Sequence, residues 1–399
     1  MSEFFDDLET RSHDQRRSDQ EAAFLKITSE MSKGLPEQLA ALKDVRSLDD
    51  LPTVPLMRKS DLAELQKSAP PFGSVDVRNA AQIFQSPGPI YEPGGISKDW
   101  WRIGRFLHAI GIRRGDVVQN CFSYHFTPAG SIFENGARAV GAIVFPAGTG
   151  QTEMQVRAAA DIGAVGYAGT PDYLKVILEK ADDMGVNLGF KMAGVGDGAL
   201  FPSLRQYYQD RGITCLQNYA TADVGNIAYE SRAVDGMIID EGVLVEIVRP
   251  GTGDPVEAGE VGEVVVTALN PDYPLIRFAT GDLSAIMPGQ SPCGRTNQRI
   301  KGWMGRADQT TKIKGMFIRP EQVAEFVGRH DEIIKARVVA TRDGESDVMT
   351  VQIEAQSGDP SKFESSIQAV MKIRGAIEIV AKGSLPNDGK VIDDQRSYD

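Results

Sequence analysis

Three short polar motifs stand in a fixed order in the second half of the chain, and each carries a charged side chain that could bind a ligand. They are LQNYATADVG (216–225), PLIRFATGDL (274–283) and GRADQTTKIKG (305–315), followed near the C-terminus by a lone Gly389-Lys390 pair. Asp223 and Asp282 offer carboxylates, which accept hydrogen bonds and bind hard metal ions. Lys390 offers a point charge that could neutralise negative charge on a reacting group.

Each motif also has an ordinary structural explanation. A Thr-Gly-Asp sequence at a strand end is typically a capped turn, in which the glycine permits a tight bend. Arg306 could pair with Asp308, Tyr219 could fill a core, and a lysine in a polar tail normally has no specific role. The order and spacing of the motifs therefore carry more weight than any single one of them.

The composition argues against several classes of protein. The 399 residues include 43 Lys+Arg and 55 Asp+Glu, and the formal net charge of −12 is wrong for a nucleic-acid binder. No apolar stretch approaches the roughly 18 residues that a membrane helix needs. The N-terminal sequence MSEFFDDLETRSHDQRR places acids where a signal peptide needs basic residues. We therefore expect a cytoplasmic protein that does not bind a membrane.

Cysteine and histidine are sparse in this chain. The three cysteines and four histidines lie far apart, and no two cysteines form a CxxC pair. This pattern predicts neither a disulfide framework nor a structural zinc site.

The elements that must position the motifs change along the chain. Residues 1 to about 70 predict a helical lead-in, with a capped helix starting near Ser60. From about 80 to 235, short apolar runs alternate with amphipathic helical runs, which is the βαβ pattern of a largely parallel sheet covered by helices. After residue 235, strands separated by glycine-containing turns predict an antiparallel part, either a distorted barrel or a second sheet.

The last part of the chain predicts a small α+β domain. Its order is the helix PEQVAEFVGRH, the strands IIKARVVATRD and VMTVQIEAQ, the helix SKFESSIQAVMKIR and the strand AIEIVA. We expect a mixed α/β fold with a large N-terminal domain over residues 1–307 and a small C-terminal domain over residues 308–399.

At these motifs the chain resembles the adenylate-forming acid–CoA ligases, and among them most closely the phenylacetate–CoA ligase family. The resemblance covers nearly all of the chain and is carried, in order, by SLDDLPTVPL, GDVVQNCFSYHF, GAIVFPAG, GTPDYL, YESRAVDGM, PCGRT and GRAD. It implies an adenylation domain, a mobile C-terminal cap and an active site in the cleft between them. It also implies a reaction in which a carboxylic acid is joined to AMP from ATP and then passed to coenzyme A, with Mg²⁺ balancing the phosphate charge.

The resemblance assigns the nucleotide to residues of several motifs. Asp282 would accept hydrogen bonds from the ribose hydroxyls, Arg306 would reach ribose or phosphate, and Tyr219 would stack on adenine. Asp223 stands where the family has its magnesium-binding glutamate, and its side chain is one methylene shorter. Further nucleotide contacts are implied at Gly88, Gly196, Asp197, Gly198, Asn218 and Ala220, although the sequence around 194–198 is equally typical of a plain turn.

The C-terminal part would carry the residues that exchange between the two half-reactions. Lys390 would neutralise charge on the carboxylate and α-phosphate oxygens during adenylation. Asp308 would be the hinge of the cap, so that one face serves adenylation and another serves thiol attack. Lys312, Lys314 and Gly315 would face the phosphates of coenzyme A, and a solvated basic turn is the alternative.

The phosphate loop departs from the family pattern. The family has a Ser/Thr/Gly-rich run with a lysine, whereas this chain has QSPGPIYEPGG (85–95), whose three prolines each lack a backbone donor. Ala279 and Ala222 likewise stand in place of an arginine and a hydroxyl residue. We therefore expect a weak hold on the terminal phosphates and an affinity for ATP only modestly above that for AMP.

The acyl group is assigned to Tyr124, His125 and Phe126, in a run that resembles the aromatic-acid-binding region of the family; a core cluster at the sheet edge is the alternative. The expected function is ATP-dependent activation of a carboxylic acid, expected to be aromatic, and its transfer to coenzyme A. Two rivals stay open: an adenylating enzyme with another acceptor, and a non-catalytic protein that binds acyl-AMP or an aryl acid. A homodimer is also open.

Overall fold

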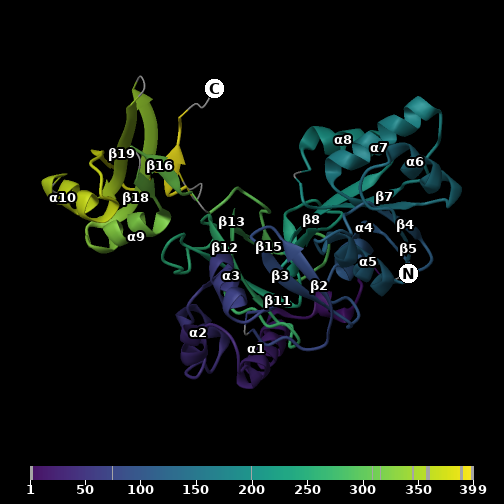
Figure 1. Ribbon diagram of the computed structural model, residues 1–399, viewed down its shortest axis with the longest axis horizontal. Helices are drawn as coiled ribbons and strands as arrows, with labels where there is room; N and C mark the ends of the chain where they lie inside the picture. Colours follow the sequence, from purple (N-terminus) through teal and green to yellow (C-terminus); the bar gives the residue numbers. More distant parts are fainter. Residues whose placement is uncertain are drawn as a thin grey trace. The chain divides into compact units, whose positions relative to one another are not determined.

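The computed structural model describes residues 3–73, 75–198, 200–307, 309–314, 316–343, 346–355, 360–386 and 390–396. The chain folds into two compact units (Figure 1). The first unit comprises Met1–Val245, Val266–Phe278 and Met287–Gly302, and the second comprises Glu246–Val265, Ala279–Ile286 and Trp303–Asp399. Among the helices of the described ranges, none combines the length and the apolar character that crossing a membrane requires.

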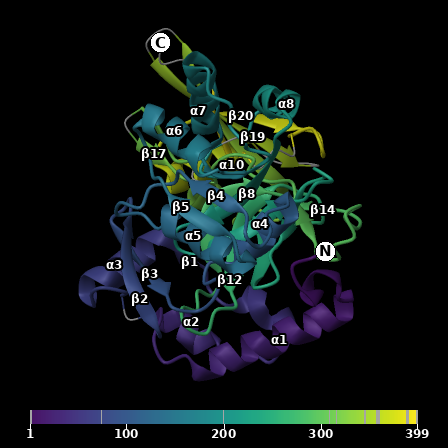
Figure 2. The ribbon, with the colours of Figure 1, turned by 90° about the vertical axis from the view of Figure 1, so that its right-hand side faces the viewer.

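The centre of the first unit is the predicted parallel sheet. Its five parallel strands are β4 (Val117–Asn120), β5 (Ile143–Pro146), β6 (Gly166–Gly169), β7 (Met192–Val195) and β8 (Thr214–Thr221), in the spatial order β8-β7-β6-β4-β5. The connecting helices are α5 (Ala129–Val140), α6 (Thr152–Asp161), α7 (Pro171–Met184) and α8 (Pro202–Asp210), and α4 (Gly104–Ile110) precedes β4. In both views, α4 and α5 lie on one side of these strands and α6 and α7 on the other (Figures 1 and 2).

Apolar side chains at helical spacing hold the second of these layers on the sheet. Leu174, Ile177 and Leu178 of α7 are buried in one cluster with Tyr167 of β6 and Cys215 of β8. Spacings of three and four residues place the α7 side chains on one helix face, which explains why this part of the fold could be predicted from periodicity.

The sheet continues beyond β8 with antiparallel strands. These are β9 (Gly225–Glu230), β10 (Met237–Ile239) and β15 (Arg299–Ile300), with β14 (Ile286–Met287) as the last strand in the order. The register shifts between Tyr219 and Ala220, where β8 pairs with β9. Such an irregularity bends a strand and redirects its side chains, and here it falls within the QNYATAD motif.

The helical lead-in is confirmed. It consists of η1 (Asp7–Thr10), α1 (His13–Glu30), α2 (Pro36–Ala41), η2 (Leu48–Thr53) and α3 (Lys59–Ser68). Phe24 of α1 is fully buried in a cluster with Leu51, Val54 and Ile276. The first unit therefore begins with helices that pack on residues more than 200 positions away in the sequence.

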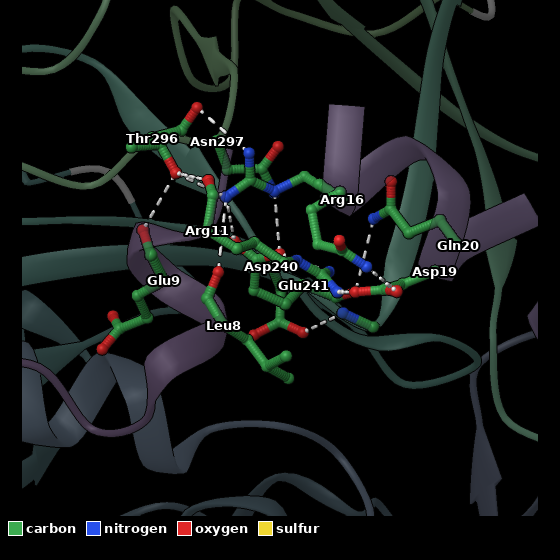
Figure 3. Close-up of polar contacts among 12 residues, drawn as sticks. Leu8, Glu9, Arg11, Arg16, Asp19, Gln20, Asp240, Glu241, Thr296 and Asn297 are labelled. Atoms are coloured by element: carbon green, nitrogen blue, oxygen red, sulfur yellow. Dashed lines mark hydrogen bonds and ion pairs between the residues drawn. The ribbon is translucent and has the colours of Figure 1, made fainter. Parts of the chain in front are cut away.

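A buried ionic network holds the N-terminal helices in place, and Figure 3 shows the part of it around Glu241. Glu241 accepts hydrogen bonds from Arg16 at 2.9 and 3.1 Å and from Arg11 at 2.8 Å. Glu9 accepts from Tyr229 at 2.9 Å and from Arg295 at 2.5 Å. Since each buried charge has a partner of opposite sign, the network avoids the cost of an isolated buried ion.

The cap of α1 gives a first test of this part of the fold. The Ser12 hydroxyl oxygen accepts a hydrogen bond from the backbone N–H of Gln15 at 3.2 Å. We expect Ser12→Ala to lower the free energy of unfolding by about 1 kcal/mol, measured by urea denaturation. Ser29→Ala, in the last turn of the same helix, is the control, because alanine is the better helix former and should cost nothing there. Equal losses for the two variants would contradict the capping role.

The predicted distorted barrel is wrong and its alternative, a second sheet, is correct, because the strands between residues 243 and 284 join an open sheet. A four-stranded sheet has the order β1-β13-β12-β11, built from β1 (Met57–Arg58), β11 (Val243–Val248), β12 (Gly262–Ala268) and β13 (Phe278–Ser284). No described strand closes it into a barrel. A separate antiparallel hairpin, β2 (Ala80–Ser86) and β3 (Ile90–Gly95), contains the loop 85–95, and α3 lies beside it (Figure 2).

The C-terminal part of the second unit has the predicted α+β order. The hairpin β16 (Thr311–Ile313) and β17 (Met316–Ile318) precedes a sheet of order β20-β19-β18-β21, with α9 (Pro320–Gly328) and α10 (Pro360–Met371). Its strands are β18 (Ile333–Asp343), β19 (Ser346–Ala355), β20 (Ala376–Val380) and β21 (Ile392–Asp394). Phe326 of α9 and Phe363 of α10 are buried against Val338 and Val351 of the sheet. The domain border at 307/308 stays a prediction.

Candidate functional site

Two of the sequence-predicted nucleotide segments meet beyond the carboxyl ends of β7 and β8 in the first unit. The Gly196-Asp197-Gly198 turn follows β7, and a Cβ atom on Gly196 would lie 2.7 Å from Oδ1 of Asn218 in β8. A larger residue at this position would have to displace the Asn218 amide. Asp197 has a positive φ of 57°, and burial raises its pKa. The carboxyl ends of parallel strands are the usual place for ligands in an α/β sheet.

Tyr219 and Ala220 follow Asn218 in β8. Tyr219 pairs with Ala228 of β9, and its side chain is buried. The Asn218 amide donates to Asn226 Oδ1 at 3.1 Å, so the strand pair is joined by side chains as well as backbone. Stacking of Tyr219 on adenine stays a prediction.

Asp223 lies in the turn between β8 and β9, at the centre of a buried polar cluster. The Lys59 ammonium group, at the start of α3, donates to Asp223 Oδ2 at 3.2 Å and to the Ser86 hydroxyl at 3.2 Å. The Ser86 hydroxyl in turn donates to Glu92 Oε1. Lys59, Ser86, Glu92 and Asp223 thus link α3, both strands of the β2–β3 hairpin and the β8–β9 turn; we call them the acidic cluster.

Burial dominates the electrostatics of the acidic cluster. Desolvation, followed by the charge of Asp223, raises the pKa of Glu92 to about 7. Desolvation also raises the pKa of Asp223, although Lys59 opposes this shift. In the described part of the chain, Asp223 Oδ1, Glu92 Oε2 and the Tyr273 hydroxyl are buried without a hydrogen-bond partner. Both carboxylates act on the pKa of Tyr273, which places the three groups close together.

A divalent cation fits the donors of this cluster. Carboxylate oxygens are the ligands that Mg²⁺ prefers, and Mg²⁺ commonly takes one or two carboxylates together with water and substrate phosphates. Within the described ranges, no three His, Cys, Asp or Glu side chains gather as a complete metal cage. The protein could therefore supply two carboxylates at most here, from Glu92 and Asp223, and the other ligands would come from outside.

The loop 85–95 is tightly packed on its surroundings. A Cβ atom on Gly95 would lie 1.9 Å from the Trp100 ring, so only glycine lets the hairpin approach this side chain. Gly88 lies in the turn of the hairpin. The backbone N–H of Gln85 donates to the Phe126 carbonyl at 2.9 Å. The predicted phosphate loop and the predicted acyl segment are therefore neighbours.

The acyl segment itself is only partly enclosed. Tyr124 is half-buried, and its hydroxyl accepts from the Asn120 amide at 2.8 Å. His125 is exposed, and the Phe126 side chain is 63% exposed. The core alternative fails for His125 and Phe126, since a core cluster would bury them. Their role in acid binding stays a prediction.

Asp282 and Arg306 lie in the second unit and contact each other directly. Asp282, in β13, forms an isolated antiparallel bridge with Arg306, and its Oδ1 accepts from Arg306 Nη1 at 2.8 Å. The Trp303 indole N–H donates to the same oxygen at 3.1 Å. The TGD and GRAD motifs are thus brought together by direct contact of Asp282 with Arg306.

Lys390 also lies in the second unit. Its ammonium group donates to Asp393 Oδ1 at 2.9 Å, and its side chain is 51% exposed. It lines a cavity of about 550 Å³ whose walls include Val256, Val327 and Leu385. The backbone carbonyl of Lys390 accepts from Arg337 of β18 at 3.0 Å, which ties this segment to the sheet.

Two of the predicted residues, Asp308 and Gly315, lie outside the described residues. Lys312 of β16 and Lys314 are exposed, and the backbone N–H of Lys314 donates to Asp347 at 3.0 Å. Contacts with coenzyme A and the hinge stay predictions.

Sequence reasoning missed Lys59 and Glu92. The sequence around Ser60 predicts only a capped helix, and Lys59 is the first residue of that helix, α3. A cation at a helix N-terminus opposes the helix dipole, so its presence there indicates a separate negative partner. This unfavourable placement of Lys59 is the sequence feature that could have indicated its partner. Glu92 has no such signal, because only the hairpin packing brings it to Asp223.

The three cysteines differ sharply in their surroundings. Cys121 and Cys215 are buried, and desolvation raises the pKa of each thiol to about 12. Cys293 is partly exposed; burial alone would raise its pKa, but hydrogen bonds from Ser231, Ser291 and Arg295 outweigh that effect and lower it.

We expect iodoacetamide at pH 7 to alkylate Cys293 at least about tenfold faster than the other two cysteines, because the thiolate is the nucleophile. Peptide mapping by mass spectrometry measures the three rates in the folded protein. Labelling at equal rates would contradict the described environment of Cys293.

Comparison with known proteins supports the resemblance. No family model matches the chain. The chain is 28% identical over 374 residues to the phenylacetate-coenzyme A ligase of Thermus thermophilus, covering 87% of this chain and 83% of that protein. It is 29% identical to the ligase of the same name from Aromatoleum evansii, covering 78% and 73%, and 28% identical to that of Escherichia coli, covering 87% and 85%.

Solved structures show the same fold. An open conformation of 2-hydroxyisobutyryl-CoA ligase, in complex with 2-HIB-AMP and CoA, matches with a TM-score of 0.72 at 23% identity, covering 96% of this chain and 92% of that one. The same ligase in its thioesterification state matches with a TM-score of 0.70, covering 99% and 93%. The chain is thus a relative of the phenylacetate-coenzyme A ligases with the fold of an adenylate-forming acyl-CoA ligase, as its motifs predicted.

Proposed function

We propose that this relative of the phenylacetate-coenzyme A ligases is itself an AMP-forming acid–coenzyme A ligase. The observation that carries the proposal is the similarity to these ligases over 87% of the chain. In the first step a carboxylate oxygen attacks the α-phosphorus of ATP, which gives acyl-AMP and pyrophosphate. In the second step the coenzyme A thiol attacks the acyl carbon, which gives the thioester, AMP and a proton.

Each residue then has a definite part in the reaction. Asp282 accepts hydrogen bonds from the ribose, and Arg306 binds ribose or phosphate. Tyr219 stacks on adenine. Lys390 neutralises charge on the α-phosphate during the first step only. Further nucleotide contacts come from the 196–198 turn and from β8.

Mg²⁺, when bound, would neutralise phosphate charge at Asp223. Lys59 adds a second positive charge next to the loop 85–95 and takes the part that a lysine within that loop has in other ligases. The loop therefore need not carry its own cation.

The proposal also covers the kind of carboxylic acid, the border of the cap and the place where the acceptor, coenzyme A, binds. We assign an aromatic acid to the segment of Tyr124, His125 and Phe126, because flat rings bury an aryl group with little loss of rotamer freedom. We place the border of the cap at residues 307/308 with Asp308 as its hinge, and coenzyme A at Lys312, Lys314 and Gly315.

Measuring AMP release with and without coenzyme A tests the acceptor. A ligase of the proposed kind releases AMP in multiple turnovers only when coenzyme A is present. Multiple-turnover AMP release with an amine or a carrier-protein thiol, and none with coenzyme A, would favour the rival acceptor. Binding of AMP without any pyrophosphate release would favour the non-catalytic binder.

Lys59 leads to a prediction about nucleotide affinity. Without divalent cation, the wild-type protein should bind ATP about tenfold more tightly than AMP, because a charged hydrogen bond to a terminal phosphate contributes roughly 1.5 kcal/mol. We expect Lys59→Met to bind the two nucleotides with nearly equal affinity in calorimetry. Lys67→Met, on the exposed end of α3, is the control and should keep the tenfold difference. A Lys59→Met protein that still prefers ATP would exclude this role.

A further inference from the structure

The acidic cluster contains two buried carboxyl groups and, among the described residues, one cation. Glu92 is 1% exposed and Asp223 is 5% exposed, so both carboxyl groups are removed from water. Among the described residues, Lys59 is the cation of this cluster, and it bonds directly to Asp223 and to Ser86 but not to Glu92. Two buried carboxylates thus share one ammonium group.

Buried polar atoms without a hydrogen-bond partner belong to the same two carboxyl groups. Asp223 Oδ1 and Glu92 Oε2 each lack a hydrogen-bond partner in the described part of the chain, as does the neighbouring Tyr273 hydroxyl. A buried polar atom without a partner has lost its hydrogen bonds to water without replacement, so such atoms on these three side chains indicate a missing ligand rather than a packing detail. Because two of these atoms are carboxylate oxygens, the ligand should be a cation.

A cation could reach the acidic cluster if the Lys59 side chain moved aside. The Lys59 side chain is 42% exposed although its ammonium group reaches the buried Asp223 carboxylate. Movement of this flexible side chain would open the cluster without unfolding the hairpin. Lysine is suited to this because its charge sits on a stem with four rotatable carbons.

We infer that Glu92 is a second carboxylate ligand, beside Asp223, for a divalent cation, and that Lys59 occupies the place of this cation until it binds. The inference rests on the proposed function only for the purpose of the cation, which is to accompany ATP. The shorter side chain of Asp223 is then compensated by a carboxylate from the loop. The missing loop lysine follows as well, since a second lysine beside Glu92 would compete with the cation.

The test measures metal binding without nucleotide or acid. Mn²⁺ stands in for Mg²⁺, and its free concentration is followed by electron paramagnetic resonance. We expect wild-type protein to bind one Mn²⁺, and Glu92→Gln and Asp223→Asn to bind it at least about tenfold more weakly, as is typical for loss of a charged ligand. Lys59→Met should bind Mn²⁺ more tightly, because it removes the competing charge. Glu179→Gln, exposed on α7, should match wild type.

The test is selective because the variants are expected to change the affinity for Mn²⁺ in opposite directions. Glu92→Gln keeps the shape of the side chain and an acceptor for Ser86, and its thermal unfolding confirms that it folds. No Mn²⁺ binding by wild type, wild-type affinity in Glu92→Gln, or weaker binding by Lys59→Met would each overturn the inference. Mn²⁺ binding through Glu92 in a protein that never releases pyrophosphate would leave the inference standing and reject the proposed function.

Discussion

Lys390→Ala is expected to slow acyl-AMP formation by about 10²- to 10³-fold, while transfer from supplied acyl-AMP to coenzyme A stays close to the wild-type rate. The reason is that the ammonium group stabilises charge that develops only when the carboxylate attacks the α-phosphorus. An interaction made mainly in a transition state is lost from kcat and kcat/KM together. In the described structure the Lys390 ammonium group donates a hydrogen bond to Asp393, whose carboxylate orients it.

Rapid-quench measurement of pyrophosphate follows the first half-reaction, and thioester formation from synthetic acyl-AMP follows the second. Lys382→Ala is the matched control, because it removes an exposed lysine from the same part of the chain. Equal slowing of both half-reactions would contradict a role confined to adenylation. An unchanged rate in both would remove Lys390 from the site.

Asp282→Ala should weaken nucleotide binding by roughly 2–4 kcal/mol, or about 30- to 1,000-fold in Kd. Its carboxylate would accept two charge-assisted hydrogen bonds from ribose, and its loss also leaves the Arg306 and Trp303 donors without their acceptor. Calorimetry with AMP measures the effect and avoids turnover.

The conservative variant Asp282→Asn separates charge from shape. It keeps one acceptor oxygen and should lose less affinity than Asp282→Ala. Unchanged AMP affinity in a folded Asp282→Ala protein, judged by thermal unfolding, would refute the assignment to ribose.

Periodicity predicted the elements that carry their own pattern. Helices α7, α9 and α10 and strands β18 and β19 were all indicated by runs of apolar residues at helical or strand spacing. The order of these runs then gave the parallel sheet and the α+β part. Such features are local, so a single sequence contains them.

The open sheet after residue 235 could not be predicted in the same way. Alternation identifies a strand and its buried face, but it does not say whether the first and last strands of a sheet pair with each other. The barrel and the open sheet differ only in that long-range pairing. Here β1, from residues 57–58, becomes a member of the sheet, a partner that lies about 200 residues from β12 and β13 in the sequence.

In the candidate site, too, some residues could be predicted from the sequence and others could not. The motif residues Asp223, Asp282 and Arg306 could be named from sequence, and the structure brings Asp282 and Arg306 into contact. Lys59 and Glu92 could not, because they lie 164 and 131 residues before Asp223 and belong to no motif with it. Buried ion pairs of this kind depend on packing, as does the network of Glu241 with Arg11 and Arg16.

The most direct measurement of the central claim is acid-dependent pyrophosphate release by the full-length protein with ATP and Mg²⁺. We would offer a panel of aryl and alkyl carboxylic acids one at a time, with and without coenzyme A. The account predicts pyrophosphate release that requires an acid, is fastest with an aryl acid, and is matched by AMP and thioester formation when coenzyme A is added. Failure of every acid to elicit pyrophosphate, from a protein that still binds AMP, would contradict it.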